Sequence, residues 1–178
     1  VAFVHEAHGS GGLADRVREL SCNPHHATML ATELLPALRA RYACAATPER
    51  TVLGGASLGG LASMYTALEH PDAVGNVLSV SGSFWYGTER DGDPEWLTRR
   101  LTATPASGLR VYQQIGRLED GALSLSPGVS HLAANRHFHE VAVAHGCDVT
   151  YDEMGTAHDI VAFRVALLRG LCALIPRR

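Results

Sequence analysis

The sequence predicts an α/β protein with a mostly parallel sheet and helices on both of its faces. Short apolar runs alternate with helical patterns along the whole chain, and this order favours parallel strands joined by right-handed crossovers. The 178 residues are enough for one domain with a sizeable core, and they contain neither a repeat nor a linker. We therefore expect residues 1–178 to form a single domain.

Five segments have the apolar or alternating pattern of strands and end in turn-forming residues. They cover residues 1–7, 51–55, 76–82, 109–116 and 147–154. The first of them, VAFVHEA, changes abruptly into the polar, glycine-rich HGSGG. This change indicates a buried strand that ends in a loop.

Five further segments have apolar residues at helical spacing or carry helix-stop signals. They cover residues 25–42, 58–71, 94–101 and 130–146, followed by a terminal helix that starts near Asp159. We expect Pro36 to kink or end the first of these helices, because proline lacks the N–H that an inner turn needs. Gly146 marks the end of the fourth.

Charge and hydropathy exclude two classes of partner. The formal net charge is -3 and there is no basic cluster, so a nucleic-acid partner is not expected. No run reaches the roughly 18 apolar residues of a membrane span. Arg164 and Arg169 interrupt the apolar tail, which favours a terminal helix that faces the core.

The strongest chemical signal is the GxSxG frame at residues 55–59, where Ser57 lies between a predicted strand and a predicted helix. In a nucleophile elbow the serine has a positive φ, and Gly55 and Gly59 must lack side chains that would collide. Such a turn places Ser57 at a helix N-terminus, where the Leu58 N–H can stabilise a developing oxyanion. The frame also occurs by chance, so its context carries the prediction.

A nucleophilic serine needs a base, and the chain has the order serine, acid, histidine that is typical of α/β-hydrolases. His158 follows the last predicted strand and is the candidate general base. Glu119 and Asp120 follow the strand before it. Glu119 is the first choice for the orienting acid and Asp120 the second, and a backbone carbonyl is a third way of holding the imidazole.

No metal or cofactor site is predicted. The four cysteines lack the paired spacing of zinc sites and the density of a disulfide scaffold, so we expect them to be buried as small apolar residues. His131, His137, His139 and His145 share a predicted helix without the HExxH pattern. The expected reaction therefore needs no metal.

Several stretches resemble segments of one esterase family, in the same order and over nearly the whole chain. They are RVRELSCN at residues 16–23, ATELLPAL at 31–38, the elbow through to SGSFWYG at 54–87, IGRLEDGAL at 115–123, LAANRHF at 132–138 and HDIVAFR at 158–164. Together they are far more specific than GxSxG. By this resemblance the chain is similar to the catalytic domain of the enterochelin esterases, within the wider esterase D family.

The resemblance implies an α/β-hydrolase fold and hydrolysis of the ester bonds of a tri-catecholate trilactone siderophore, free or loaded with iron, in the cytoplasm. It implies that Ser57 is the nucleophile, His158 the base and Glu119 the residue of the acid loop. It also implies that Arg16 faces the anionic catecholate and that Trp85 lines the pocket. The alternative interpretations are a solvated charge for Arg16 and a core aromatic for Trp85.

The chain departs from the family pattern at three positions and at its N-terminus. Ala56 stands where the family often has glutamine, Tyr86 follows Trp85, and Phe163 stands where a tryptophan is common. These differences leave open another carboxylic ester, such as a feruloyl ester, or acyl transfer. Relatives begin with earlier strands and a loop that supplies a second oxyanion donor, so we expect an N-terminally incomplete domain, with a non-catalytic binding domain as the alternative.

Overall fold

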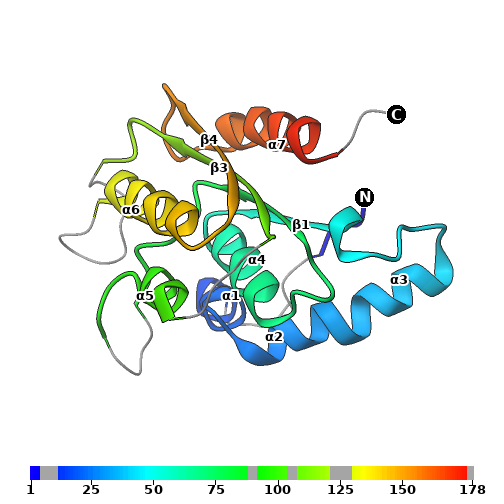
Figure 1. Cartoon of the computed structure of the whole chain (residues 1–178). Helices are drawn as coiled ribbons and strands as arrows, with labels where there is room; N and C mark the ends of the chain where they lie inside the picture. Colours follow the sequence, from blue (N-terminus) through cyan, green and yellow to red (C-terminus); the bar gives the residue numbers. More distant parts are fainter. Residues whose placement is uncertain (5–11, 88–91, 104–107, 121–129, 176–178) are drawn as a thin grey trace.

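A parallel four-stranded sheet forms the centre of the computed structural model, which describes residues 1–4, 12–87, 92–103, 108–120 and 130–175 (Figure 1). The strands are β1 (Val52–Ala56), β2 (Asn76–Val80), β3 (Arg110–Gly116) and β4 (Asp148–Met154), and they lie side by side in chain order. All three pairings are parallel, with Val80 opposite Gln114 and Gly116 opposite Met154. The carboxyl ends of the four strands therefore meet at one edge of the sheet.

Helices cover both faces of the sheet, as predicted. Helix α7 (Ile160–Leu174) packs on one face against β2 and β3. On the opposite face, α4 (Leu58–Glu69) contacts β1 and β2, and α6 (His131–Ala144) contacts β3 and β4 (Figure 1). None of the described helices is both long enough and apolar enough to cross a lipid bilayer.

Shorter helices precede the sheet or lie between its strands in the chain. They are α1 (Leu13–Leu20), α2 (Pro24–Thr28), the π-helical η1 (Met29–Leu34), α3 (Leu35–Arg41), the 3-10 turn η2 (Pro48–Arg50) and α5 (Trp96–Ala103). Asn23 caps α2, since its side chain accepts hydrogen bonds from the His25 and His26 N–H groups. Helix α1 was not predicted. It has only 8 residues, little more than two turns, and such a short stretch is difficult to recognise as a helix from the spacing of its apolar residues.

The long helix predicted over residues 25–42 is present, but it is not α-helical throughout. Its middle, Met29–Leu34, is π-helical, and the Leu35 N–H donates to Leu30 O. The π-helical stretch ends two residues before Pro36, whose ring nitrogen cannot donate to the preceding turn. The proline therefore coincides with a change in the type of turn and does not end the helix, which continues to Arg41.

Two apolar layers hold the helices to the sheet. The layer on the face of α4 and α6 includes Met64, Phe84 and Phe138, and the two phenylalanine rings stack with their centroids 3.7 Å apart. The layer under α7 is smaller and is formed by Leu78, Val80, Tyr112, Ala166 and Leu174. Burial of these side chains is the main favourable contribution to holding both helical layers in place.

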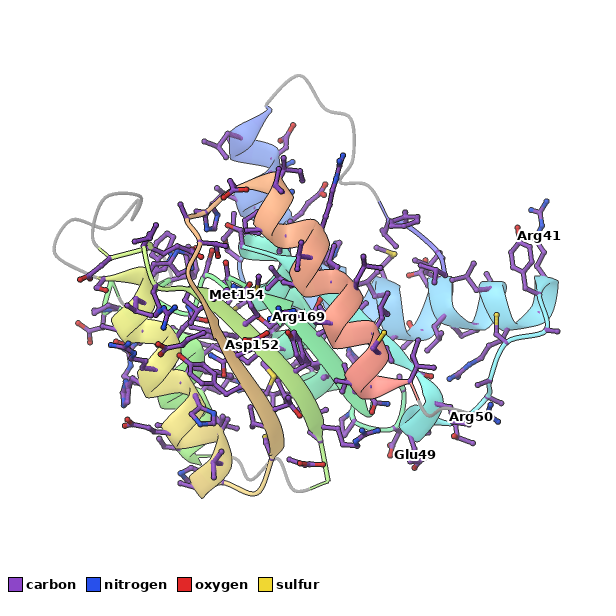
Figure 2. The ribbon with its side chains drawn as sticks, turned by 90° about the horizontal axis from the view of Figure 1, so that it is seen from above. Arg41, Glu49, Arg50, Asp152, Met154 and Arg169 are labelled. Atoms are coloured by element: carbon purple, nitrogen blue, oxygen red, sulfur yellow. The ribbon has the colours of Figure 1, made fainter. Side chains whose placement is uncertain are left out.

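Helix α7 lies close to the sheet because a glycine faces the strands. A Cβ at Gly170 would lie 2.6 Å from Tyr112 Cδ1 and 2.7 Å from Leu78 Cγ. Asp152 on β4 accepts hydrogen bonds from Tyr112 Oη at 2.8 Å and from Arg169 Nη1 at 3.0 Å, so it joins α7 to the sheet. Figure 2 shows Arg169 on α7 beside Asp152 on the strand beneath it. The predicted core-facing terminal helix is confirmed.

The strand predicted at residues 1–7 is wrong for the part that the structure describes. Residues 1–4 form no strand and are exposed, with Phe3 at 88% exposure, and residues 5–7 lie outside the described part of the chain. A strand needs a neighbour for its backbone N–H and C=O groups. Among the described residues, residues 1–4 pair with no strand, although β1 pairs only with β2 and its other edge carries no described strand.

The prediction that all four cysteines are buried is wrong for two of them. Cys22 and Cys147 are buried, whereas Cys44 and Cys172 are exposed. Cys44 lies in the connection after α3, and Cys172 lies on the part of α7 that faces away from the sheet. Burial follows the face of the element on which each thiol lies.

Candidate active site

Ser57 lies in a sharp turn between the end of β1 and the start of α4. Its backbone has φ 58° and ψ -123°, a conformation that residues other than glycine rarely adopt. The turn is held on both sides. The Ser57 N–H donates to Val80 O at 2.9 Å, and Ser57 O accepts from the N–H groups of Gly60, Leu61 and Ser83. The strained turn expected from the GxSxG frame is present.

Two glycines permit the close contacts of this turn, but they are not the two that were predicted. A Cβ at Gly55 would lie 2.6 Å from the carbonyl carbon of Gly59, so Gly55 is needed as expected. A Cβ at Gly59 would meet nothing within 4 Å among the described residues, so the collision predicted there is wrong. The second constrained position is Gly60, whose Cβ would lie 2.6 Å from Ser79 Oγ and 3.1 Å from Gly82 Cα.

The Leu58 N–H lies at the first position of α4, where no preceding turn supplies an intrahelical acceptor. The partial positive charge of a helix N-terminus is centred on such groups. The Leu58 side chain is 5% exposed and packs in the core, which fixes the start of the helix. This N–H can therefore donate to an oxygen that is bound beside Ser57.

Glu119 follows β3 at the same edge of the sheet, and it is buried. Its Oε1 accepts hydrogen bonds from Ser81 Oγ at 2.6 Å and from the Gly116 N–H at 2.8 Å. Its Oε2 lies 2.7 Å from Nδ1 of His158 and accepts from it. The neighbouring Asp120 is exposed. Of the three groups considered for holding the imidazole, the Glu119 carboxylate is the one that contacts it.

The hydrogen bonds to Glu119 keep it ionised despite its burial. Burial by itself raises the pKa of a carboxyl group, but the hydrogen bonds from His158, Ser81 and the Gly116 N–H more than offset it, so the pKa of Glu119 lies below its ordinary value of 4.5. At neutral pH the residue is a carboxylate. It can therefore hold a proton on Nδ1 of His158.

The loop that carries His158 is fixed at its far end by a helix cap. The next residue, Asp159, accepts hydrogen bonds from the Val161 and Ala162 N–H groups and so starts α7. The ring of Phe163 contacts the imidazole edge-on, with 4.9 Å between centroids. The His158 side chain keeps 21% of its surface exposed, so the imidazole is oriented and still accessible.

Ser57 and His158 lie at the same edge of the sheet but make separate hydrogen bonds in this structure. Ser57 Oγ is 3.3 Å from Ser83 Oγ, and His158 bonds to Glu119. Among the described residues no hydrogen bond joins the serine to the histidine. Hydrogen bonds between catalytic groups are often formed only when substrate is bound. Their meeting therefore remains a prediction.

The structure adds Ser81 and His131 to the site, and the sequence analysis selected neither. Ser81 has φ 46°, and its hydroxyl donates to Glu119. His131 is the first residue of α6 and is 3% exposed. Its Nδ1 lies 3.5 Å from Glu119 Oε2, and its ring centroid lies 5.1 Å from that of His158. Ser81 and His131 are part of no recognisable sequence motif. The only indication in the sequence is that each follows a strand or a loop at the edge of the sheet where the strands end.

Trp85 and Arg16, the two expected substrate-binding residues, lie in different surroundings. Trp85 is 5% exposed, and its ring contacts His131 edge-on with 6.3 Å between centroids. Its Nε1 is buried and has no hydrogen-bond partner among the described residues. Arg16 is partly buried on α1, which packs against α4. Trp85 therefore borders the site directly, whereas Arg16 lies on a helix that packs on the helix following Ser57.

The comparisons with known proteins show to which family the chain belongs. The family described as "Putative esterase" matches residues 3–174 of the chain. The chain belongs to this esterase family. The iron(III) enterobactin esterase of Escherichia coli K12 is 31% identical over 162 residues, which cover 89% of this chain and 38% of that relative. The iron(III) salmochelin esterase of Escherichia coli O6:H1 is 31% identical over 152 residues, 80% of this chain and 35% of that protein.

A solved structure of the same esterase type has the same fold. The crystal structure of the enterobactin esterase from Shigella flexneri, obtained in the presence of enterobactin, matches with a TM-score of 0.78 and 28% identity over 90% of this chain and 40% of that one. The expected α/β-hydrolase fold is thus confirmed for this member of the esterase family. The chain spans less than two fifths of the length of the two curated relatives, at 38% and 35%.

Proposed function

We propose that this member of the esterase family hydrolyses the ester bonds of a catecholate trilactone siderophore through a triad of Ser57, His158 and Glu119. The observation that carries the proposal is the 2.7 Å hydrogen bond between Glu119 Oε2 and His158 Nδ1, at the edge of the sheet that also holds the strained Ser57. The acid is buried and the imidazole is accessible. That is the arrangement that a base beside a substrate requires.

In the proposed reaction, His158 Nε2 takes the proton of Ser57 Oγ while this oxygen attacks the ester carbonyl carbon. Glu119 holds the other proton on Nδ1 and stabilises the imidazolium that forms. His158 then gives the proton to the leaving alcohol, which leaves an acyl group on Ser57. A water molecule attacks this acyl-enzyme in the same way and releases the acid. For the first step, Ser57 Oγ must exchange its contact with Ser83 for one with His158.

The Leu58 N–H is the proposed oxyanion donor. It lies one residue after the nucleophile, at the start of α4, and is fixed by the buried Leu58 side chain. A donor that is already oriented needs no reorganisation when the negative charge develops. One such donor typically contributes about 10²- to 10³-fold to the rate.

The siderophore substrate is supported by the relatives and by Trp85. The curated relatives are named iron(III) enterobactin and salmochelin esterases, and the Shigella flexneri structure was obtained with enterobactin. Trp85 borders the site with an apolar ring and an N–H that has no hydrogen-bond partner in the part of the chain that the structure describes. Arg16 on α1 is the proposed positive partner of the catecholate oxygens. The proposal places the reaction in the cytoplasm, where the released iron is used.

A fluorophosphonate probe tests whether Ser57 is activated, because it reacts with nucleophilic serine hydroxyls. We expect stoichiometric labelling of the wild-type chain and none of Ser57→Ala. Ser63→Ala is the matched control, because Ser63 lies on the same helix and its hydroxyl only donates to Gly59 O. It should label like the wild type. A well-folded wild-type chain that does not label would favour a non-catalytic binding domain.

Hydrolysis assays with two esters then test the substrate. The wild type should hydrolyse both a small activated ester and a catecholate trilactone, and Ser57→Ala should hydrolyse neither. Equal turnover by the two chains would overturn the serine mechanism. Turnover of the small ester alone would keep the mechanism and overturn the siderophore as substrate. Products with added alcohols distinguish hydrolysis from acyl transfer.

A further inference from the structure

Three side chains that can bind a metal ion surround one carboxylate oxygen in the candidate active site. Glu119 follows β3, His131 begins α6, and His158 lies between β4 and α7. Glu119 Oε2 is 2.7 Å from Nδ1 of His158 and 3.5 Å from Nδ1 of His131. One donor atom from each of the three residues lies within 4.8 Å of the others. The fold thus brings two imidazoles and a carboxylate from three segments to one point.

The proposed triad does not include His131. The contact between His131 and Glu119 is not a good hydrogen bond. His131 Nε2 lies 2.9 Å from Gly82 O, and a carbonyl oxygen can only accept, so Nε2 carries a proton. In the neutral imidazole, Nδ1 then presents a lone pair. This lone pair faces the carboxylate oxygen at 3.5 Å, beyond the usual hydrogen-bond range. Two electron-rich atoms face each other, an arrangement that favours a cation between them.

The orientation of His131 is also that of a metal ligand. Histidines that bind metal ions usually donate their other ring N–H to a carbonyl or carboxylate, which fixes the ring and its tautomer. Gly82 O has this role here, and it also accepts from Asn135 Nδ2 at 2.8 Å. Asn135 lies one turn after His131 on α6 and donates to His131 O as well. The imidazole is therefore held with Nδ1 toward the carboxylate.

The donor separations suit a small divalent transition metal. Zn²⁺ binds histidine nitrogen and carboxylate oxygen at about 2.0–2.2 Å in tetrahedral geometry, which places its donors about 3.3 Å apart. The two separations from Glu119 Oε2, 2.7 Å and 3.5 Å, lie on either side of this value. The donor atoms of all three residues lie within 4.8 Å of one another, a wider spread than this spacing, so the side chains must move closer together to complete the geometry.

We propose that Glu119, His131 and His158 bind Zn²⁺ or a similar divalent transition metal, and that the bound ion switches off the esterase site. The ion takes the lone pair of His131 Nδ1, an oxygen of Glu119 and Nδ1 of His158, whose proton moves to Nε2. No proton is lost in this exchange. His158 Nε2 then carries a hydrogen and cannot accept one from Ser57. Binding of the ion is independent of the proposed function, whereas the loss of hydrolysis rests on it.

The surroundings give the ion one open side. The side chains of Glu119 and His131 are 0% and 4% exposed, and that of His158 is 21% exposed. The rings of Trp85 and Phe163 contact the two imidazoles edge-on. The ion therefore enters beside His158 and keeps a water molecule there as its fourth ligand. The apolar rings exclude water from the other sides.

Metal titrations of the EDTA-treated chain test the site without reference to catalysis. Zn²⁺ is measured by competition with a chromogenic chelator, and Co²⁺ by the visible absorption of tetrahedral coordination. We expect one tightly bound ion per chain, and binding weakened about 10- to 100-fold or more in His131→Gln and in Glu119→Gln. His137→Gln is the matched control. His137 lies on the same helix and contacts the Glu95 carboxylate, but no third ligand joins that pair among the described residues.

The outcomes separate the metal site from the proposed esterase activity. Equal Zn²⁺ affinity in the wild type, His131→Gln and Glu119→Gln, with all three folded by thermal melting, would overturn the site. If His131→Gln does not fold, His158→Gln replaces it, because His158 is partly exposed. In the wild type, Zn²⁺ should stop ester hydrolysis and EDTA should restore it. Binding without inhibition would overturn the switch, and a chain that binds Zn²⁺ but hydrolyses no ester would contradict only the proposed function.

Discussion

Helix α6 carries two contacts between a histidine and a glutamate, and the two differ in their surroundings. His131, at the start of the helix, faces Glu119, and the two side chains are 4% and 0% exposed. His137, farther along, contacts Glu95, and those side chains are 54% and 24% exposed. The first contact lies beside His158 and the strand ends, and the second lies at the surface.

The difference shows that burial and the number of partners decide what such a pair can do. Glu119 accepts hydrogen bonds from three fixed donors, Ser81, Gly116 and His158, so its negative charge acts on a small set of atoms. Glu95 shares its charge with the solvent, which screens it. The same two residue types therefore form a candidate catalytic element in one place and a surface contact in the other.

The largest difference between the two regions is expected in kcat when the histidine of each region is replaced with alanine. His158→Ala removes the proposed base and should lower kcat for an activated ester by about 10⁴- to 10⁶-fold, as expected for loss of a triad histidine. His137→Ala removes a surface partner and should change kcat less than about twofold. Steady-state hydrolysis measures both. A His158→Ala loss as small as the one expected for His137→Ala would show that His158 is not the base.

Replacing the acidic residues should lower kcat less than replacing His158. Glu119→Gln keeps the size of the side chain, but the uncharged amide no longer stabilises the imidazolium of His158, so kcat should fall by about 10⁴-fold. Glu95→Gln and Asp120→Asn should have wild-type kcat, because Glu95 contacts His137 and Asp120 is exposed. An Asp120→Asn loss as large as that of Glu119→Gln would reassign the orienting acid.

Acid pH should destabilise the buried cluster more than the surface pair. Burial lowers the pKa of His131 below its ordinary 6.5, although the facing Glu119 opposes this shift and His158 adds to it. The unfolded chain therefore binds this proton at a higher pH than the folded one, so stability is lost as the pH falls below about 6.5. The lowered pKa of Glu119 adds a further loss below its ordinary value of 4.5.

Thermal melting in EDTA at several pH values measures this loss. His131→Gln cannot titrate, so its Tm should fall less between about pH 7 and pH 5 than that of the wild type. Parallel curves for the wild type and His131→Gln would mean that protonation of His131 does not change the stability of the protein.

The smallest expected effect is the change in the stability of the protein when the contact between His137 and Glu95 is removed. His137→Gln should lower the free energy of unfolding by about 0–1 kcal/mol, because water competes for both partners of a surface contact and the side chains lose entropy when they are held. Added salt should reduce the difference further. Urea unfolding at low and high salt measures it, and a loss well above this range would make the surface pair a structural element.

Much of the architecture could be predicted from the sequence, because its signals are local. The second predicted strand is β1, and the pattern of apolar residues around Ser57 correctly places a strand before it and a helix after it. The cap at Asp159 correctly marks the start of α7. The strand predicted at residues 1–7 is absent from residues 1–4, because a local apolar pattern does not determine whether a segment pairs with another strand.

The rest of the site depends on contacts between distant segments. Ser81 and His131 reach Glu119 only because β2, β3 and α6 meet at one edge, and no spacing in the sequence records that meeting. The tight position at Gly60 depends likewise on how α4 lies over Ser79. Glu119 could be named because it follows a predicted strand in the chain order of a known mechanism.

The sheet has its strands in chain order, and this makes the two ends of the sheet unequal in their tolerance of extra residues. A strand advances about 3.3 Å per residue. One residue inserted within β4 would move His158 by more than the 2.7 Å that separates it from Glu119. An insertion beside Gly146, in the turn that enters β4 from the opposite end, would leave that distance unchanged. We therefore expect this protein to tolerate added residues where β4 begins, but not where it ends.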